Sequence, residues 1–250
     1  MIKKAVIPAA GLGKRFLPAT KAQPKEMLPI IDTPTIQYVV QEAIDSGIDD
    51  ILIISGKGKR TLEDHFDRNF ELEEQLKSKE DSDLYHEIRR ISDMANIHFV
   101  RQKEFKGLGD AIYYARLHTG DEPFAVLLGD TIIDSVIPVT QQLIDIYEQY
   151  RQTIIGVEVV PKEKVSRYGM VGGEKISDSM CEVSELIEKP SVEKSPSNLA
   201  IAGRYILTSA IFKAIEQTPH GKNNEIQLTD AMRNLLRREN IYSYTIEGKR

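Results

Sequence analysis

Residues 4–29 read KAVIPAAGLGKRFLPATKAQPKEMLP, a short apolar run followed by a connection that holds glycines, cations and prolines. The run at residues 4–8 is typical of a buried strand, and the connection is too rich in glycine and proline for an ordinary strand-to-helix turn. Gly11 and Gly13 let backbone N–H groups approach an anion closely, and Arg15 adds a forked, charged donor. The pattern predicts a phosphate-holding loop directly after the first strand.

The prolines of this connection, at positions 18, 24 and 29, predict a segment that is extended and stiff, because proline fixes the backbone angle φ. Lys21 and Lys25 would then be held over the same ligand as the glycine loop.

Other interpretations of the connection are a dinucleotide fingerprint, a Walker-type loop and a plain surface loop. Asp32 lies at a suitable distance to hold a ribose, but Phe16 stands where the fingerprint has its third glycine, and the prolines would break its helix. Neither this connection nor SGKGK at residues 55–59 matches the Walker pattern. A surface loop with scattered lysines stays open as the purely structural alternative.

The composition bounds the class of protein. With 250 residues, 41 % of them hydrophobic and 28 % charged, the chain is long enough for one large α/β domain or two small ones. A formal charge of −5 argues against a nucleic-acid binder. The single cysteine, Cys181, cannot form an internal disulfide, and no apolar stretch approaches the roughly 20 residues of a membrane helix. We therefore expect a cytoplasmic protein without a membrane partner.

The rest of the chain continues the alternation of strands and helices. Short apolar runs at 50–54, 97–101 and 124–128 alternate with helical patterns at 35–46, 109–118 and 138–150, which predicts a parallel sheet flanked by helices. Later strand-like pieces at 154–160, 168–173, 183–187 and 199–206 suggest an antiparallel or mixed portion, with helices at 209–217 and 226–238. The last strand, 241–246, has nothing after it to cover it, so we expect a sheet edge there.

Residues 9–43, AAGLGKRFLPATKAQPKEMLPIIDTPTIQYVVQEA, closely resemble the N-terminal signature of prokaryotic UTP–glucose-1-phosphate uridylyltransferases, a group of sugar-1-phosphate nucleotidyltransferases. The resemblance covers essentially the whole chain. It continues in the family's order through RQKEFKGLGDA, VLLGDT, RYGMVG, LIEKP, AIAGRYIL and NEIQLTDA.

The resemblance implies an α/β fold with a Rossmann-like, mixed but mostly parallel sheet, of the nucleotidyltransferase or glycosyltransferase-A-like type. It implies transfer of a uridylyl group from UTP to glucose 1-phosphate, assisted by Mg²⁺, in a homo-oligomer that is a dimer or a tetramer. Thymidylyl transfer from dTTP, or a non-catalytic subunit that binds nucleotide sugars, are the alternatives. We expect one domain over residues 1–250, with a helical excursion at about 61–95 and a sugar-binding portion at about 154–240.

The resemblance also assigns roles to single residues. Arg15, Lys25 and Asp130 would be catalytic, and Asp130, at the end of the strand FAVLLGD, would be the metal ligand. The residues that would bind the nucleotide are Ala9, Ala10, Gly11, Gly13, Gln102 and Gly107, with Gln102 reading the uracil edge. The residues that would bind the sugar phosphate are Gly169, Val171, Glu188, Lys189 and Gly203. Glu225 and Asp230 would shape the wall of the pocket.

The chain departs from the family pattern at a few positions. Asp110 stands where the family usually has histidine, and Thr131 where it usually has a second aspartate. The family also continues beyond residues 248–250 with a further segment, from which related enzymes draw a second metal ligand. This chain lacks that C-terminal tail, so we expect either that the sequence is a shortened form or that metal binding and activity are weaker than the signature implies.

Overall fold

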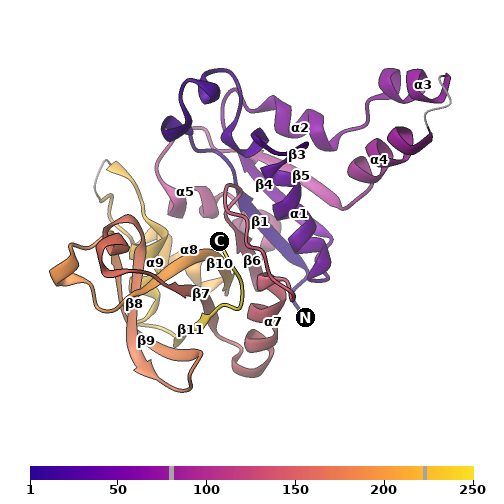
Figure 1. Ribbon diagram of the computed structural model, residues 1–250. Helices are drawn as coiled ribbons and strands as arrows, with labels where there is room; N and C mark the ends of the chain where they lie inside the picture. Colours follow the sequence, from indigo (N-terminus) through magenta and orange to yellow (C-terminus); the bar gives the residue numbers. More distant parts are fainter. Residues whose placement is uncertain (79–81, 222–223) are drawn as a thin grey trace.

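Four parallel strands form one half of the sheet of the protein, seen in a computed structural model that describes residues 1–78, 82–221 and 224–250 (Figure 1). They are β1 (Lys4–Pro8), β4 (Asp50–Ser55), β5 (Asn96–Arg101) and β6 (Phe124–Leu127), in the spatial order β5-β4-β1-β6. The short apolar runs of the sequence predicted these strands to within a residue, because the central strands β4, β1 and β6 are covered on both faces and are apolar at their centres. The prediction of a parallel sheet in the first half is confirmed.

The other half of the sheet is mixed. Strand β10 (Leu199–Leu207) runs antiparallel between β6 and β7 (Thr153–Val159), and β11 (Ile241–Thr245) lies parallel to β7. Beyond β11 follow β9 (Met180–Glu188) and β8 (Gly169–Lys175), both in antiparallel pairings. Strand β8 also pairs with β10, so the strands of this half form a closed ring of pairings.

The expectation of an edge at the last strand is wrong. Strand β11 is bonded on both sides, to β7 and to β9, and lies inside the sheet. Its partners precede it by tens of residues, so no local pattern could reveal the pairing.

Helices cover both faces of the sheet in two separate cores. Helices α1 (Thr35–Asp45), α2 (Arg60–Phe66) and α7 (Val139–Tyr150) pack on the face that receives Ala5 and Ile7 of β1. Helices α5 (Leu108–Tyr113), α8 (Ala210–Glu216) and α9 (Leu228–Leu235) pack on the face that receives Val6. This is the alternation that a pleated strand imposes on neighbouring residues. The predicted helix 109–118 is divided in two, since α6 (Arg116–Thr119) follows α5 after a turn.

The connection after β1 is not extended, contrary to the expectation from its prolines. It coils through three short 3₁₀ turns, η1 (Lys14–Phe16), η2 (Ala19–Lys21) and η3 (Lys25–Met27), before the small hairpin of β2 (Pro29–Ile30) and β3 (Thr33–Pro34). The φ that proline fixes is shared by 3₁₀ and extended backbone, so proline alone does not choose between them. The hydroxyl of Thr20 donates to the carbonyl oxygen of Gly13 at 2.8 Å and holds the coil closed. Two further 3₁₀ segments, η4 (Lys162–Arg167) and η5 (Val192–Lys194), lie in the second half.

Between β4 and β5 the chain leaves the sheet. Helices α3 (Phe70–Ser78) and α4 (Ser82–Ser92) project away from the body, with α2 nearer to it (Figure 1). The predicted charged helical stretch is thus divided into separate helices, and its residues 79–81 lie outside the described residues.

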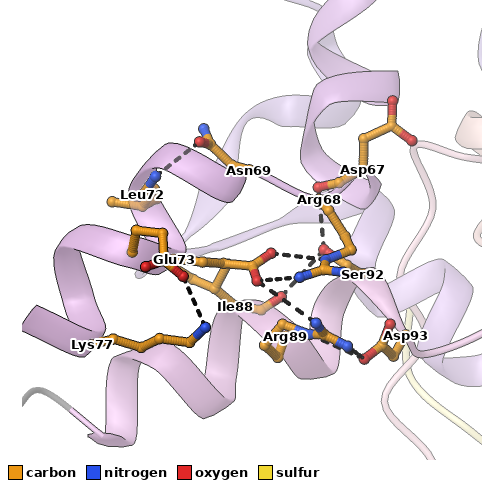
Figure 2. Close-up of polar contacts among 11 residues, drawn as sticks. Asp67, Arg68, Asn69, Leu72, Glu73, Lys77, Ile88, Arg89, Ser92 and Asp93 are labelled. Atoms are coloured by element: carbon orange, nitrogen blue, oxygen red, sulfur yellow. Dashed lines mark hydrogen bonds and ion pairs between the residues drawn. The ribbon is translucent and has the colours of Figure 1, made fainter.

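An ion cluster joins α3 to α4. Figure 2 shows the carboxylate of Glu73 between Arg68, which donates to it at 2.6 Å, and Arg89, whose guanidinium is 3.6 Å away. Arg89 also pairs with Asp93. Glu73 is almost fully buried, and the hydrogen bond from Arg68 holds the pKa of its carboxyl below the ordinary value. Within the described parts of the chain, none of the helices combines the length and the apolar character needed to span a bilayer.

Candidate active site

The parallel strands β1, β5 and β6 end at the same edge of the sheet, and the candidate site begins there. Ala9 to Gly11 follow β1, Gln102 follows β5, and Asp130 lies three residues beyond β6. Backbone hydrogen bonds fix these exits, since the N–H of Ala9 donates to Ile54 and the N–H of Gln102 to Ser55, each at 2.9 Å. In open α/β sheets the carboxyl ends of the strands are where ligands bind.

A cavity of about 790 Å³ opens at this edge. Of the residues predicted to bind nucleotide or to be catalytic, those that line it are Ala10, Gly11, Gly13, Lys25, Gln102, Gly107 and Asp130. The structure therefore brings together groups that are up to 120 residues apart in the chain, in a volume of the size that small ligands occupy.

The ammonium group of Lys25 lies at the centre of the polar wall. It forms an ion pair with Asp130, and a β-carbon built on Gly11 would lie 3.6 Å from it. Lys25 thus faces both the glycine loop and the carboxylate. Gly13 has a φ of 65°, in the left-handed region, and a β-carbon there would come within 3.2 Å of Lys25 and 3.0 Å of Thr20. The tight coil around Lys25 needs glycine at that position.

A buried ion pair between Glu26 and Lys59 lies next to Lys25. Nζ of Lys59 donates to Oε2 of Glu26 at 2.7 Å, and both side chains are almost completely inaccessible. Oε1 of Glu26 receives no hydrogen bond within the described parts of the chain and lies 3.9 Å from Nζ of Lys25. Burial raises the pKa of the Glu26 carboxyl and lowers that of the Lys59 ammonium, and the pairing opposes both shifts.

Gln102 forms the opposite wall. Its side chain is 4 % exposed, and its amide nitrogen donates to Asp110 at 2.6 Å and to the carbonyl oxygen of Gly107 at 3.3 Å. Gly107 has a φ of 97°, and a β-carbon there would lie 2.6 Å from the carbonyl oxygen of Ile226. The backbone N–H of Ile226 donates a hydrogen bond to the carbonyl oxygen of Lys106, and the N–H of Gly109 donates one to the carbonyl oxygen of Ile226. These hydrogen bonds join the loop after Gln102 to the segment just before α9.

Of the predicted sugar-phosphate residues, Gly169, Glu188 and Lys189 form a second group where the start of β8 pairs with the end of β9. Glu188 accepts from Thr229 at 2.7 Å and pairs with Lys189 at 2.9 Å. Gly169 lies opposite Glu188 in the strand register, and a β-carbon on Gly169 would be 2.8 Å from the hydroxyl of Thr229. This group offers an acceptor and a cation next to a bare backbone, but none of these residues lines the cavity.

Other predicted residues lie apart from both groups. Arg15 is exposed on η1 and does not line the cavity, whereas its neighbour Lys14 does. Lys21 is exposed and does not line it either, so the expectation that it shares a ligand with Lys25 is not met. Ala9 and Val171 are buried in the cores.

Gly203 and the predicted wall residues have separate places. Gly203, with a φ of 82°, packs against Leu128, which lines the cavity. Of the predicted wall residues, Glu225 lines the cavity, whereas Asp230 pairs with Arg233 beside a different hollow.

Several side chains at the site were missed as functional candidates. They are Lys14, Glu26, Lys59 and Phe105, together with Asp110, which was noted only as a departure from the family pattern. Glu26 in KEMLP and Lys59 in SGKGKR are charged residues inside motifs that the sequence analysis considered. Their ion pair could not be predicted, because the two residues are 33 positions apart and no periodic pattern links them.

The donor set at Asp130 indicates which metal could bind. Within the described ranges there is no group of three or more His, Cys, Asp or Glu side chains that could hold a metal ion by themselves. A single, partly exposed carboxylate fits a hard divalent cation that takes its remaining ligands from water and phosphate oxygens. Asp130 therefore fits a metal that is shared with a bound phosphate.

A comparison with protein families identifies the family of the chain. Residues 4–249 match the family model described as nucleotidyl transferase. The chain belongs to the nucleotidyl transferase family. The predicted fold class is confirmed by this match and by solved structures of similar fold.

Two similar proteins are named as UTP–glucose-1-phosphate uridylyltransferases. The UTP–glucose-1-phosphate uridylyltransferase YngB of Bacillus subtilis is 53 % identical over 249 residues, which are 100 % of this chain and 84 % of that protein. The UTP–glucose-1-phosphate uridylyltransferase of Staphylococcus epidermidis is also 53 % identical, over 86 % of its length. The predicted resemblance to this group of nucleotidyl transferases is confirmed.

Solved structures of nucleotidyl transferases agree. A UDP-glucose pyrophosphorylase complexed with UDP-glucose is 46 % identical, with a TM-score of 0.90 over 100 % of this chain and 92 % of that one. A UTP-bound UGPase from Acinetobacter baumannii is 40 % identical, with a TM-score of 0.92 over 100 % of this chain and 87 % of that one.

Proposed function

We propose that this nucleotidyl transferase is a UTP–glucose-1-phosphate uridylyltransferase, which converts UTP and glucose 1-phosphate to UDP-glucose and pyrophosphate. The observation that carries the proposal is the cavity at the sheet edge, where the glycine loop, Lys25, Asp130 and Gln102 meet. The names of the relatives support the choice of substrates. Two of them are called UTP–glucose-1-phosphate uridylyltransferases, and one similar solved structure is a pyrophosphorylase complexed with UDP-glucose.

In this reaction a phosphate oxygen of glucose 1-phosphate attacks the α-phosphorus of UTP. A new P–O bond forms, the bond from the α-phosphorus to the bridging oxygen breaks, and its electron pair leaves with pyrophosphate. Because a phosphate monoester has a second pKa of about 6, the attacking oxygen is already ionised at neutral pH and no general base is needed. The residues then have to align the two anions and neutralise charge.

The chain offers groups for both tasks. The loop of Gly11 and Gly13 would hold the triphosphate, and Lys25 would neutralise charge that builds at the α-phosphate. Gln102 would read the base. On the other side, Glu188 would accept from sugar hydroxyls, and Lys189 would pair with the phosphate of glucose 1-phosphate.

Asp130 would hold a divalent cation, which we propose to be Mg²⁺. When bound, such an ion supplies positive charge that the phosphate oxygens share. That the enzyme works in the cytoplasm as a homo-oligomer stays a prediction from the sequence.

The experiment that tests this function is release of pyrophosphate from UTP and glucose 1-phosphate, with and without Mg²⁺. Reactions with dTTP, ATP and galactose 1-phosphate are run beside it. Release that requires UTP, glucose 1-phosphate and Mg²⁺ is expected. Equal release with dTTP would make the enzyme a thymidylyltransferase as well, and no release with any pair would refute the proposal.

Removal of either charged group of the Lys25–Asp130 pair should abolish most turnover without unfolding the protein. We expect Lys25→Ala and Asp130→Asn each to lower kcat by about 100-fold or more, since preorganised charge contributes on that scale. Stability should change by less than about 1 kcal/mol, because the pair is partly exposed. Steady-state kinetics and urea unfolding measure the two effects.

Lys213→Ala is the matched control, because Lys213 is an exposed lysine on α8 outside the cavity. It should leave both kcat and stability unchanged. Near-normal turnover of Lys25→Ala and Asp130→Asn would show that the roles given to these two residues are wrong.

A further inference from the structure

The side-chain amide of Gln102 has one fixed orientation. Its nitrogen carries two hydrogens, and it has two acceptors within reach, Oδ2 of Asp110 at 2.6 Å and the carbonyl oxygen of Gly107 at 3.3 Å. Both donors of the amide are therefore used inside the protein.

Asp110 decides this orientation. A carboxylate and a backbone carbonyl only accept hydrogen bonds, so turning the amide over would place its oxygen 2.6 Å from a carboxylate oxygen, with no hydrogen between them. The remaining atom, Oε1 of Gln102, accepts from no residue in the described parts of the chain, and the side chain lines the cavity. What Gln102 offers to a ligand is therefore an acceptor.

The bases differ in what they present to such an acceptor. Uracil and thymine carry an N–H at ring position 3, which donates. Cytosine has an unprotonated nitrogen there, which repels a second acceptor. When a buried acceptor faces a base that cannot donate to it, the loss in binding is large. Such a mismatch discriminates between bases far more strongly than a difference in the size of the base does.

We propose that Asp110 is a positioning residue for base selection: it holds Gln102 with its amide oxygen in the cavity, so that the site takes pyrimidines with an N–H at position 3 and rejects cytosine. The proposal rests on the proposed function, in that the cavity takes a nucleoside triphosphate. It adds a role for a residue that touches Gln102 and not the base.

A purely structural role is the competing explanation. Asp110 lies in the first turn of α5, where any carboxylate stabilises a helix. Loss of that effect would weaken folding and lower turnover with every nucleotide alike. Only the ratio between nucleotides separates the two explanations.

The test is the ratio of kcat/KM for UTP to that for CTP in Asp110→Asn. Asparagine has nearly the same shape but can donate or accept, so the shorter of the two contacts that fix the amide of Gln102 no longer opposes its turning over, and only the longer contact with the carbonyl oxygen of Gly107 still does. We expect the UTP-to-CTP ratio to fall by about tenfold or more, mainly through KM, while the values for UTP and dTTP fall together. Glu104→Gln is the control, since Glu104 pairs with Lys106 on the same loop and forms no hydrogen bond with the side chain of Gln102 among the described residues. Its ratio should equal that of the wild type.

An unchanged UTP-to-CTP ratio in a folded Asp110→Asn protein overturns the proposal. If the variant does not fold, the wild-type protein still tests the proposal with UTP that is methylated at N3. This nucleotide has no hydrogen at N3 to donate to Gln102, so the wild type should bind it more weakly than UTP. Equally tight binding of the two nucleotides would overturn the proposal as well. If the wild type releases no pyrophosphate from any pair, the proposed function fails. Calorimetric binding of UTP and CTP to the wild type and Asp110→Asn then tests the base selection alone.

Discussion

Gly107 occupies a position that only glycine can fill without moving its neighbours. Its φ of 97° is left-handed, and a β-carbon would lie 2.6 Å from the carbonyl oxygen of Ile226. We expect Gly107→Ala to displace the loop that carries the acceptor for Gln102, and so to raise KM for UTP as well as to destabilise the fold. Kinetics and urea unfolding measure both.

Gly47→Ala is the matched control for this prediction. Gly47 also has a positive φ, 77°, but a β-carbon there meets nothing within 4 Å. This substitution should cost only the backbone strain of about 1 kcal/mol and leave KM unchanged. Equal effects of both substitutions would show that the contact with Ile226 is unimportant.

The buried pair of Glu26 and Lys59 makes a prediction about stability. Lys59→Met leaves the buried carboxylate of Glu26 without its hydrogen-bonding partner, which should cost about 3–5 kcal/mol in the free energy of unfolding. The double variant Lys59→Met with Glu26→Gln should recover part of this loss, because no buried charge then remains. Urea unfolding checks both, and a loss below about 1 kcal/mol in the single variant would contradict the argument.

Some residues of the candidate site could be predicted from the sequence and others could not. Gly11, Gln102 and Asp130 could be predicted because each follows an apolar strand, and Lys25 could be predicted because KEMLP belongs to the family signature. Asp110 could not, since its role depends on a side-chain hydrogen bond across a loop that a sequence does not specify. The functional roles themselves stay predictions until the variants are measured.

Among the helices and strands, the pair of α3 and α4 depends on ionised Glu73 (Figure 2). Its folded-state pKa lies below the ordinary 4.5, chiefly because of the hydrogen bond from Arg68. The unfolded chain therefore binds the proton more readily, and the stabilisation is complete above pH 4.5 and is lost as the pH falls through the lower, folded value.

The measurement is the melting temperature of the wild type and of Glu73→Gln across pH. The difference between them should be largest above pH 4.5 and should vanish in more acidic solution. Glu74→Gln is the control, because Glu74 is exposed and pairs only with Lys77 in the described structure. A difference that is the same at every pH would rule out ionisation as its cause.

Local patterns were sufficient for most elements and failed where conformation depends on distant contacts. The centres of strands β1, β4 and β6 are apolar, so their runs stand out between polar helices, whereas β5 alternates polar and apolar residues. The connection after β1 was predicted to be extended and is coiled, because a contact between Thr20 and Gly13 closes it.

For the molecule as a whole, β11 is the strand that completes the sheet. A protein shortened to residues 1–240 loses the strand bonded to both β7 and β9. We expect it to lack a cooperative thermal transition, measured by circular dichroism. Removal of residues 248–250 alone takes away the bridge between Lys249 and Asp134 but leaves β11, so that protein should still unfold cooperatively. Cooperative unfolding of residues 1–240 would show that β11 is dispensable.

The place of β11 also has a consequence for biosynthesis. Strands β7 and β9 leave the ribosome long before residues 241–245 are made, and until then each carries a row of unpaired backbone groups on the side where β11 will lie. Until residues 241–245 are made, the nascent chain therefore has two open strand edges, the form in which chains pair wrongly with one another. Folding of the second half has to wait for β11, so chaperone binding during synthesis should concentrate on β7 and β9, while the parallel half around β1 can form first.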